Sequence, residues 1–141
     1  MSKYGPIVIV EDDPDDQLIY KEIIASLHPK NEITIFDNGE DVLHYLQNTR
    51  EQPFLIISDI NLPRMNGLEL RRQIDASETL RKKSIPFVFL STTDAGHIVE
   101  EAYDLTAQGF FVKAHAYADI ASQLKCIFEY WKACRHPNSS K

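Results

Sequence analysis

The sequence predicts an α/β fold, in which a parallel sheet carries helices on both of its faces. Five short apolar runs are rich in β-branched and aromatic residues, and they lack the polar alternation of a half-exposed strand. Helical patterns of apolar residues lie between these runs. Regular alternation of strands and helices is typical of a parallel sheet with right-handed crossover connections.

The five predicted strands are the apolar runs themselves. Because each run is short and continuous, all five strands are expected to be buried on both faces. In chain order they are "PIVIV" at 6–10, "ITIF" at 33–36, "FLIIS" at 54–58, "FVFL" at 87–90 and "FFV" at 110–112.

Five helices are predicted between and after these strands. The first has the clearest start, since Asp13 is a suitable N-cap and Pro14 can occupy the first helical position. Asp15 and Asp16 are then interpreted as first-turn acids, which complement the helix dipole. The apolar positions that define the helices are Ile19, Ile23 and Leu27; Val42, Leu43 and Leu46, after a turn at 37–39; Leu68, Leu70 and Ile74; Ile98, Ala102, Tyr103 and Leu105; and Ile120, Leu124, Ile127, Phe128 and Trp131.

Length and composition indicate one globular domain. With 141 residues, of which 43% are hydrophobic and 26% charged, we expect a single domain over 1–141, a core at about 5–133 and a polar tail at 136–141. The net charge of −6 argues against a nucleic-acid partner, which needs a basic surface. No apolar stretch approaches the roughly 18 residues of a membrane span, and the N-terminus lacks a signal core, so a cytoplasmic protein without a membrane partner is expected.

The two cysteines, Cys126 and Cys134, lie outside any zinc-binding spacing. They are eight residues apart on the last predicted helix, about 12 Å at the helical rise, which is too far for a disulfide. Both are therefore predicted to be free thiols.

Polar residues follow four of the five predicted strands. Glu11 and Asp12 come after the first, Asp59 after the third, Ser91 after the fourth and Lys113 after the fifth. Each alone has an ordinary explanation, as a turn-forming acid, a loop hydroxyl or a surface lysine. Because ligands bind at the carboxyl ends of parallel strands, we expect these residues to converge on one edge of the sheet.

The chemistry of these residues suits phosphoryl transfer. The three carboxylates form a concentrated set of hard oxygen ligands, and Mg²⁺ takes one or two carboxylates together with waters and phosphate oxygens. The metal would also offset the repulsion among the crowded acids. A carboxylate is a competent nucleophile, and Lys113 and the Ser91 hydroxyl would help neutralise a phosphoryl group.

Four stretches carry a resemblance to a known family. "IVIVEDD" at 7–13, "IISDINLPRMNG" at 56–67, "VFLST" at 88–92 and "GFFVK" at 109–113 occur in the order and spacing of a response-regulator receiver domain. The chain resembles this family over roughly residues 5–133. Partly through "DINLPRMNG", it is also similar to single-domain regulators that are paired with phytochrome-like histidine kinases.

The resemblance implies a flavodoxin-like (βα)₅ fold with a doubly wound sheet of strand order 2-1-3-4-5. It implies that a sensor histidine kinase or a histidine phosphotransfer protein donates a phosphoryl group, with Mg²⁺ as cofactor. The resemblance implies that Asp59 is the phosphoryl acceptor and that Asp12, Glu11, Asp59 and the backbone carbonyl of Asn61 bind the metal. It implies that Ser91 is the switch hydroxyl and that Lys113 pairs with the phosphoryl group. Phe110 matches the aromatic switch of the family, although a plain role in the core stays open for it.

The sequence departs from the family after the lysine. The family has proline there, with a cis peptide bond, whereas this chain has Ala114. Because a cis bond costs about 2.5–4 kcal/mol without proline, we expect the Lys113–Ala114 bond to be trans.

The expected output is protein contact. No output domain is predicted, so a downstream protein target or onward phosphotransfer is expected. A face built from the fourth helix, fifth strand and fifth helix also allows a homodimer.

Three alternatives compete with a phosphoryl-accepting signalling role, in which the protein is not an enzyme. An aspartyl phosphatase of the haloacid dehalogenase type would need a second aspartate where Asn61 stands. A flavodoxin-like FMN carrier would repel phosphate with the acids of its first loop. A phosphorylation-independent scaffold would not need the complete set of Asp59, Ser91 and Lys113.

Overall fold

The computed structural model describes residues 5–27 and 30–135, so the polar tail predicted at 136–141 lies outside the described residues. Strands and helices alternate along the chain as predicted, with an additional helix before the fourth strand. The elements are β1 (Ile7–Val10), α1 (Pro14–Leu27), β2 (Ile33–Phe36), α2 (Gly39–Asn48), β3 (Leu55–Ser58), α3 (Gly67–Ala76), α4 (Glu78–Lys83), β4 (Phe87–Ser91), α5 (Gly96–Asp104), β5 (Gly109–Val112) and α6 (Tyr117–Ala133).

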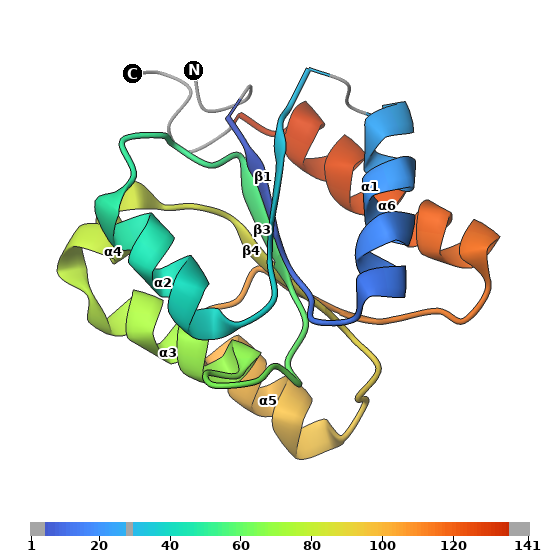
Figure 1. The fold of residues 1–141 in the computed structure, drawn as a ribbon. Helices are drawn as coiled ribbons and strands as arrows, with labels where there is room; N and C mark the ends of the chain where they lie inside the picture. Colours follow the sequence, from blue (N-terminus) through green and yellow to red (C-terminus); the bar gives the residue numbers. More distant parts are fainter. Residues whose placement is uncertain (1–4, 28–29, 136–141) are drawn as a thin grey trace.

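The sheet has the order β2-β1-β3-β4-β5, and all neighbouring strands are parallel. This confirms the expected strand order. Helices α1 and α6 cover one face of the sheet, and α2, α3 and α5 cover the other (Figure 1). Each face has its own apolar core, because side chains of a strand alternate between the two faces. In register, Val10 at the end of β1 lies beside Phe36 and Ser58, so the strands end side by side. The side of the sheet where the strands end is called the carboxyl edge, and the side where they begin is called the amino edge.

The prediction that all strands are buried on both faces is correct for β1, β3 and β4 only. Strands β2 and β5 are partly exposed, because they are the two outermost strands of the sheet and each has only one neighbouring strand. Sequence periodicity does not reveal which strand becomes an edge. The assignment of Tyr103 to the apolar face of its helix was also wrong, since this side chain is half exposed.

The additional helix α4 divides what was expected to be a simple connection between the third helix and the fourth strand. Ser77 ends α3, and its hydroxyl accepts a hydrogen bond from the backbone N–H of Leu80 as the N-cap of α4. Leu80 is buried in the core beneath α2 and α3, which holds this short helix in place. One buried residue in six is too weak a pattern for a sequence-based prediction.

Three smaller expectations are also settled in the described residues. The Lys113–Ala114 bond is trans, since no peptide bond within 5–27 and 30–135 is cis. Cys126 and Cys134 are free, as predicted. No helix in the same ranges has the length and apolar character needed to cross a membrane.

Candidate functional site

The backbone ladder of the sheet continues past the strand ends and places the predicted site residues beside one another. The N–H of Glu11 donates to the carbonyl of Phe36 at 2.9 Å, and the N–H of Asp59 donates to the carbonyl of Val10 at 3.0 Å. On the other side, the N–H of Lys113 donates to the carbonyl of Ser91 at 2.7 Å. The five predicted residues therefore converge on one edge of the sheet.

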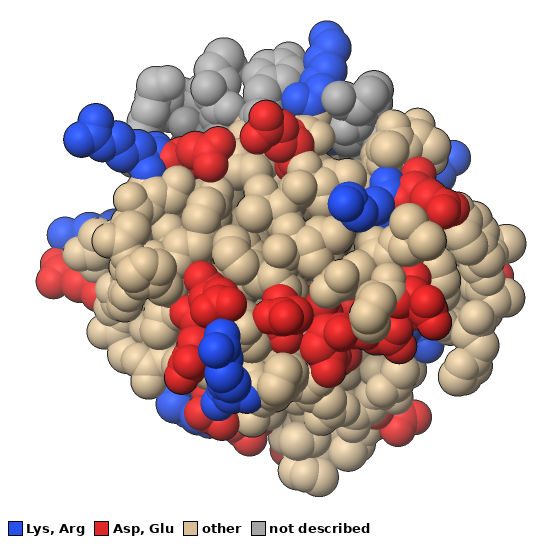
Figure 2. All heavy atoms as spheres, in the orientation of Figure 1, with Lys and Arg blue, Asp and Glu red and all other residues tan. Residues whose placement is uncertain are grey.

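Three acids form a compact cluster at this carboxyl edge. Glu11, Asp12 and Asp59 each present one carboxylate oxygen, and these oxygens all lie within 4.8 Å of one another. Glu11 and Asp59 are buried and Asp12 is exposed, so the cluster is open to solvent on one side. Figure 2 shows acidic side chains in a row across this face of the molecule, at the level where the strands end in Figure 1. The crowded carboxylates and their open side suit a hard divalent cation.

Glu11 is the most enclosed of these acids. Burial raises the pKa of the Glu11 carboxyl, Lys113 opposes that effect, and the negative charge of Asp59 adds to it. One oxygen accepts a hydrogen bond from the N–H of Asp13 at 3.2 Å, and the other accepts from the Tyr20 hydroxyl at 3.5 Å. The Glu11 carboxylate is therefore fixed in position before any ligand arrives.

Asp59 directly follows the central strand β3 and keeps one oxygen available. Its Oδ1 accepts a hydrogen bond from the N–H of Ile60 at 2.7 Å, whereas no described residue donates to the other oxygen. Gly67 packs so closely on the backbone here that a Cβ would lie 2.1 Å from the Asp59 carbonyl oxygen. Asn61 follows in the same loop with an exposed side chain. The arrangement offers one carboxylate oxygen for attack on an electrophile.

Lys113 is buried and makes two ion pairs. Its Nζ donates to Glu11 Oε1 at 3.1 Å and to Asp16 Oδ2 at 2.8 Å, and it lies 5.5 Å from the centre of the Tyr20 ring. Burial alone would lower the pKa of Lys113, but the hydrogen bond to Asp16 and the neighbouring Tyr20 and Glu11 raise it overall. The ammonium is therefore firmly charged. No described ion pair joins it to Asp59.

Asp16 is a site residue that sequence reasoning missed. The prediction placed it among the first-turn acids of α1, and the confirmed N-cap is Asp13, whose side chain accepts from the N–H of Asp15 at 2.9 Å. Asp16 instead reaches across the edge to Lys113. One signal was present, because Asp16 lies four residues before the buried Tyr20 and so shares its inward helix face.

The two predicted switch residues occupy different environments. Ser91 is fully buried at the end of β4, and its Oγ accepts a 3.5 Å hydrogen bond from the N–H of Thr93. Phe110 is partly buried in β5, with its ring centre 5.8 Å from that of Phe89. The Phe110 ring packs against the apolar core and also lines a pocket at the surface.

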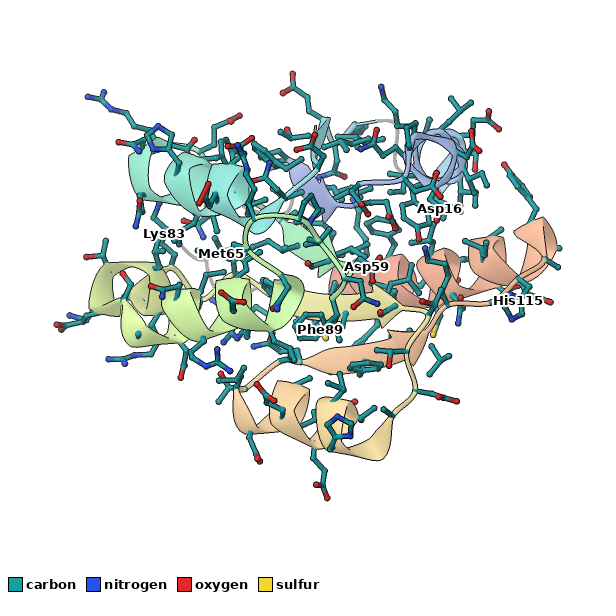
Figure 3. All side chains as sticks on the ribbon, turned by 60° about the horizontal axis from the view of Figure 1, so that its bottom comes forward. Asp16, Asp59, Met65, Lys83, Phe89 and His115 are labelled. Atoms are coloured by element: carbon teal, nitrogen blue, oxygen red, sulfur yellow. The ribbon has the colours of Figure 1, made fainter. Side chains whose placement is uncertain are left out.

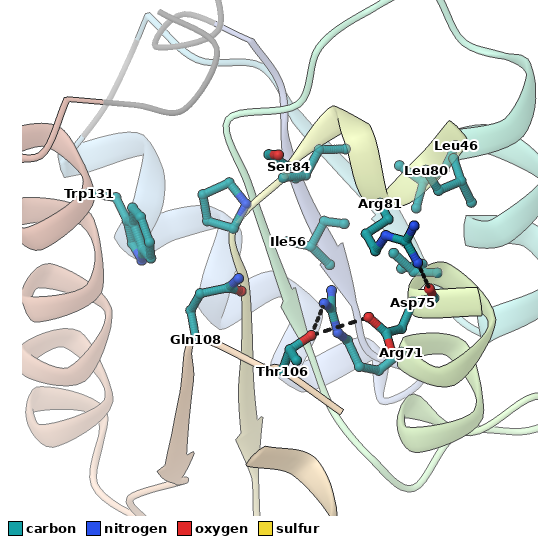
Figure 4. A pocket seen from close by; sticks show the side chains of 13 residues that line it. Leu46, Ile56, Arg71, Asp75, Leu80, Arg81, Ser84, Thr106, Gln108 and Trp131 are labelled. Carbon is teal, nitrogen blue, oxygen red and sulfur yellow. Dashed lines mark hydrogen bonds between the residues drawn. The ribbon is translucent and has the colours of Figure 1, made fainter. Parts of the chain in front are cut away.

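A cavity lies at the opposite end of the strands, the amino edge, beside the residues that precede β4 and β5. It has a volume of about 290 Å³, and Arg71 is the buried cation on its wall. The Arg71 guanidinium donates to the Thr106 hydroxyl at 2.7 Å (Figure 4) and to the Leu105 carbonyl at 2.8 Å. These neutral partners connect α3 to the loop before β5, which is a structural task.

Comparison with known proteins identifies the family. The model of the response regulator receiver domain matches residues 7–125. The response regulator Rcp1 of Synechocystis sp. is 27% identical over 130 residues, which cover 89% of this chain and 87% of Rcp1. The probable methanogenesis regulatory protein FilR2 of Methanothrix harundinacea is 28% identical over 129 residues, which cover 89% of this chain and 82% of FilR2.

Solved structures agree with this family. The phosphorylated cyanobacterial phytochrome response regulator RcpA has a TM-score of 0.85 at 28% identity, with 94% of this chain and 98% of that chain covered. The Mn²⁺-bound form of Rcp1 has a TM-score of 0.83 at 26% identity, with 93% and 97% covered. With the family model spanning most of the chain and the acids, hydroxyl and lysine on one edge, the chain belongs to the response regulator receiver domain family, the phosphoryl-accepting signalling domains of two-component systems.

Proposed function

We propose that Asp59 accepts the phosphoryl group. The observation that carries this assignment is its carboxylate, which has one oxygen held by the Ile60 N–H and the other without a donor among the described residues. Asp59 also lies at the end of the central strand, within the acid cluster. In the transfer, the N–P bond of a donor phosphohistidine breaks, an O–P bond forms on Asp59, and the bonding electron pair stays on the imidazole nitrogen.

A divalent cation, Mg²⁺ in the cell, fits the acid cluster by its donor chemistry. Three carboxylate oxygens within 4.8 Å of one another are a hard ligand set of the kind that Mg²⁺ shares with waters and phosphate oxygens. Asp12, Asp59 and the backbone carbonyl of Asn61 would hold the ion directly, and Glu11 would orient its waters. When bound, the ion supplies positive charge at the phosphoryl oxygens.

Lys113 and Ser91 act on the phosphoryl group rather than on the metal. The Lys113 ammonium offers a point charge to phosphoryl oxygens, and the Ser91 hydroxyl offers a hydrogen-bond donor. Both side chains lie at the edge where Asp59 ends its strand, on the β4 and β5 side of it. Movement of Ser91 toward the phosphoryl group would release space beside Phe110, and the Phe110 ring would turn into that space.

The downstream partner docks on the face formed by α5, β5 and α6. Tyr103 and Tyr130 are each about half exposed there, and Phe110 helps to line a groove of about 310 Å³ between them. Either a target protein or a second copy of the chain would cover these apolar side chains. Sedimentation with and without a phosphoryl analogue separates the homodimer from a monomer that needs another target.

We place the protein in the cytoplasm, where thiols such as Cys126 stay reduced.

Phosphorylation by acetyl phosphate in the presence of Mg²⁺, read by intact mass, tests the proposal. The wild-type protein should gain one phosphoryl group, and EDTA or the Asp12→Ala variant should suppress the gain. Asp59→Asn should not react, whereas Asp104→Asn, which removes an exposed acid from α5, should react like the wild type. A phosphoryl gain in Asp59→Asn would assign the acceptor elsewhere, and no gain in any variant would favour a phosphorylation-independent scaffold.

A further inference from the structure

We propose that Asp16 is a positioning residue that holds Lys113 in a resting place and competes with the phosphoryl group for its ammonium. The inference rests on the proposed function, because it takes Asp59 as the phosphoryl acceptor. Asp16, an acid of α1, would then set how readily the phosphorylated state forms. Figure 3 shows Asp16 on α1 and Asp59 beyond β3, both at the carboxyl edge.

The contact between Asp16 and Lys113 is the shorter of the two ion pairs of this lysine. The Nζ–Oδ2 distance is 2.8 Å, against 3.1 Å to Glu11 Oε1. The Lys113 side chain is only 7% exposed, and that of Asp16 is 26% exposed. A charge-assisted hydrogen bond in such a partly buried place is stronger than a surface ion pair.

The first turn of α1 does not need Asp16 for its own stability. Asp13 already caps the helix, and Asp15 already places a negative charge in the same turn. Asp15 is exposed and makes no ion pair with any residue in the described ranges. Asp16 differs from Asp15 because it reaches a lysine that is 97 positions away in the sequence.

Asp16 becomes the principal competitor once the site is loaded. In the described structure, Lys113 is held by Glu11 and Asp16, on the α1 side of the edge, and is not paired with Asp59. Glu11 belongs to the acid cluster and would orient the waters of a bound cation, a task that would compete with its hold on the lysine. Asp16 lies outside that cluster and keeps its contact. The phosphoryl group must therefore draw Lys113 away from Asp16 or share it.

Beryllofluoride, a phosphoryl analogue, measures this competition at saturating Mg²⁺. Amide NMR shifts report its dissociation constant for the wild type, Asp16→Asn and the matched control Asp15→Asn. Asp16→Asn should bind about 3–10-fold more tightly, as expected for loss of a partly exposed charge-assisted contact. Asp15→Asn should stay within about twofold of the wild type, because only a distant, screened charge is removed.

A double-mutant cycle with Lys113→Met identifies the route of the effect. If Asp16 acts through the lysine, Asp16→Asn should change beryllofluoride affinity no more than Asp15→Asn does once Lys113 is methionine. Direct repulsion between Asp16 and the bound anion would instead persist in that background and would overturn the proposal. Asp16→Glu, which keeps the charge, should return the affinity toward the wild-type value.

The outcomes separate this inference from the proposed function. If Asp59→Asn binds beryllofluoride as well as the wild type, the proposed acceptor is wrong. If the wild type binds through Asp59 but Asp16→Asn behaves like Asp15→Asn, the proposed function stands and the role of Asp16 is refuted. Asp16→Ser serves as a second test variant, and amide spectra taken without ligand verify that each variant is folded.

Discussion

Among the described residues, one buried cation lies at each end of the strands, and the hydrogen-bond partners of the two cations differ in kind. Lys113 at the carboxyl edge faces the carboxylates of Glu11 and Asp16. Arg71 at the amino edge faces a backbone carbonyl, a hydroxyl and the ring of Phe87, whose centre lies 5.4 Å from the guanidinium carbon. Burial lowers the pKa of Arg71 against the opposing charge of Asp75, whereas Asp16, Tyr20 and Glu11 together overcome burial and raise the pKa of Lys113.

This difference separates a working site from a structural contact. The hydrogen-bond partners of Arg71 are neutral and hold α3 against the loop before β5, and the charge of the nearby Asp75 adds to this contact. At the carboxyl edge one lysine meets more acids than it can neutralise, since Asp12 and Asp59 remain beside Glu11. An excess of negative charge at an open edge is costly without a ligand and is relieved by a cation. Excess charge therefore marks the edge that binds ligands.

Of the two buried cations, Lys113 should produce the larger functional loss when it is replaced by methionine. Removing one charged donor from a phosphoryl site typically lowers the rate by about 10²–10³-fold. Binding of Mg²⁺ should be unchanged or tighter, because a positive neighbour is lost. Rates of phosphorylation by acetyl phosphate and an NMR titration with Mg²⁺ measure the two effects. NMR is preferable to tryptophan fluorescence because Trp131 borders the amino-edge cavity. A large loss of Mg²⁺ affinity would place Lys113 in metal binding.

Arg71→Met should give the opposite pattern. It removes the charged donor from the Thr106 hydroxyl and from the Leu105 carbonyl, which keeps only the hydrogen bond from the Thr106 hydroxyl, and this should lower the free energy of unfolding by about 2–4 kcal/mol. Phosphorylation of the folded variant should be unaffected. Urea unfolding measures the loss, with Arg72→Met as control, since Arg72 makes only an exposed ion pair with Glu101 worth about 0–1 kcal/mol. Equal effects of the two variants would contradict the structural role of Arg71.

Gly67→Ala should have a smaller effect that links stability to the site. A Cβ at Gly67 would lie 2.1 Å from the Asp59 carbonyl oxygen, so the loop after β3 must shift. We expect a loss of about 1–3 kcal/mol in unfolding free energy and weaker Mg²⁺ binding. Gly96→Ala is the matched control, because nothing lies within 4 Å of its Cβ and it should be neutral or slightly stabilising. Intact Mg²⁺ binding in Gly67→Ala would show that the loop absorbs the change.

Mg²⁺ should stabilise the protein modestly through the carboxyl edge alone. A ligand that binds only the folded state at a few times its dissociation constant adds about 1 kcal/mol. The melting temperature should therefore rise with Mg²⁺ in the wild type and in Arg71→Met, but not in Asp12→Ala. A comparable rise in Asp12→Ala would mean that the ion binds at another place.

The sequence predicted most of the carboxyl edge because strand ends in a parallel sheet converge by topology. Glu11, Asp12, Asp59, Ser91 and Lys113 could each be placed there from the run that precedes them. Asp16 could not, because its pairing with Lys113 depends on how α1 is rotated about its own axis. The role of Arg71 was hidden for the same reason, since its partners lie in a loop more than 30 residues away.

The fold was predictable where hydrophobic periodicity decides it. Strands β1, β3 and β4 and the apolar faces of α1 and α6 follow directly from the pattern. The exposed edges of β2 and β5 depend on strand order, which periodicity does not contain. Helix α4 depends on a single serine cap and one buried leucine.

The location of the phosphoryl group tests the central claim most directly. After phosphorylation with Mg²⁺, borohydride reduces an aspartyl phosphate to homoserine, which peptide mass spectrometry assigns to one position. The account predicts homoserine at residue 59 alone, in the wild type and in Arg71→Met. Homoserine at position 12 or 16, or at any position outside the carboxyl edge, would contradict it.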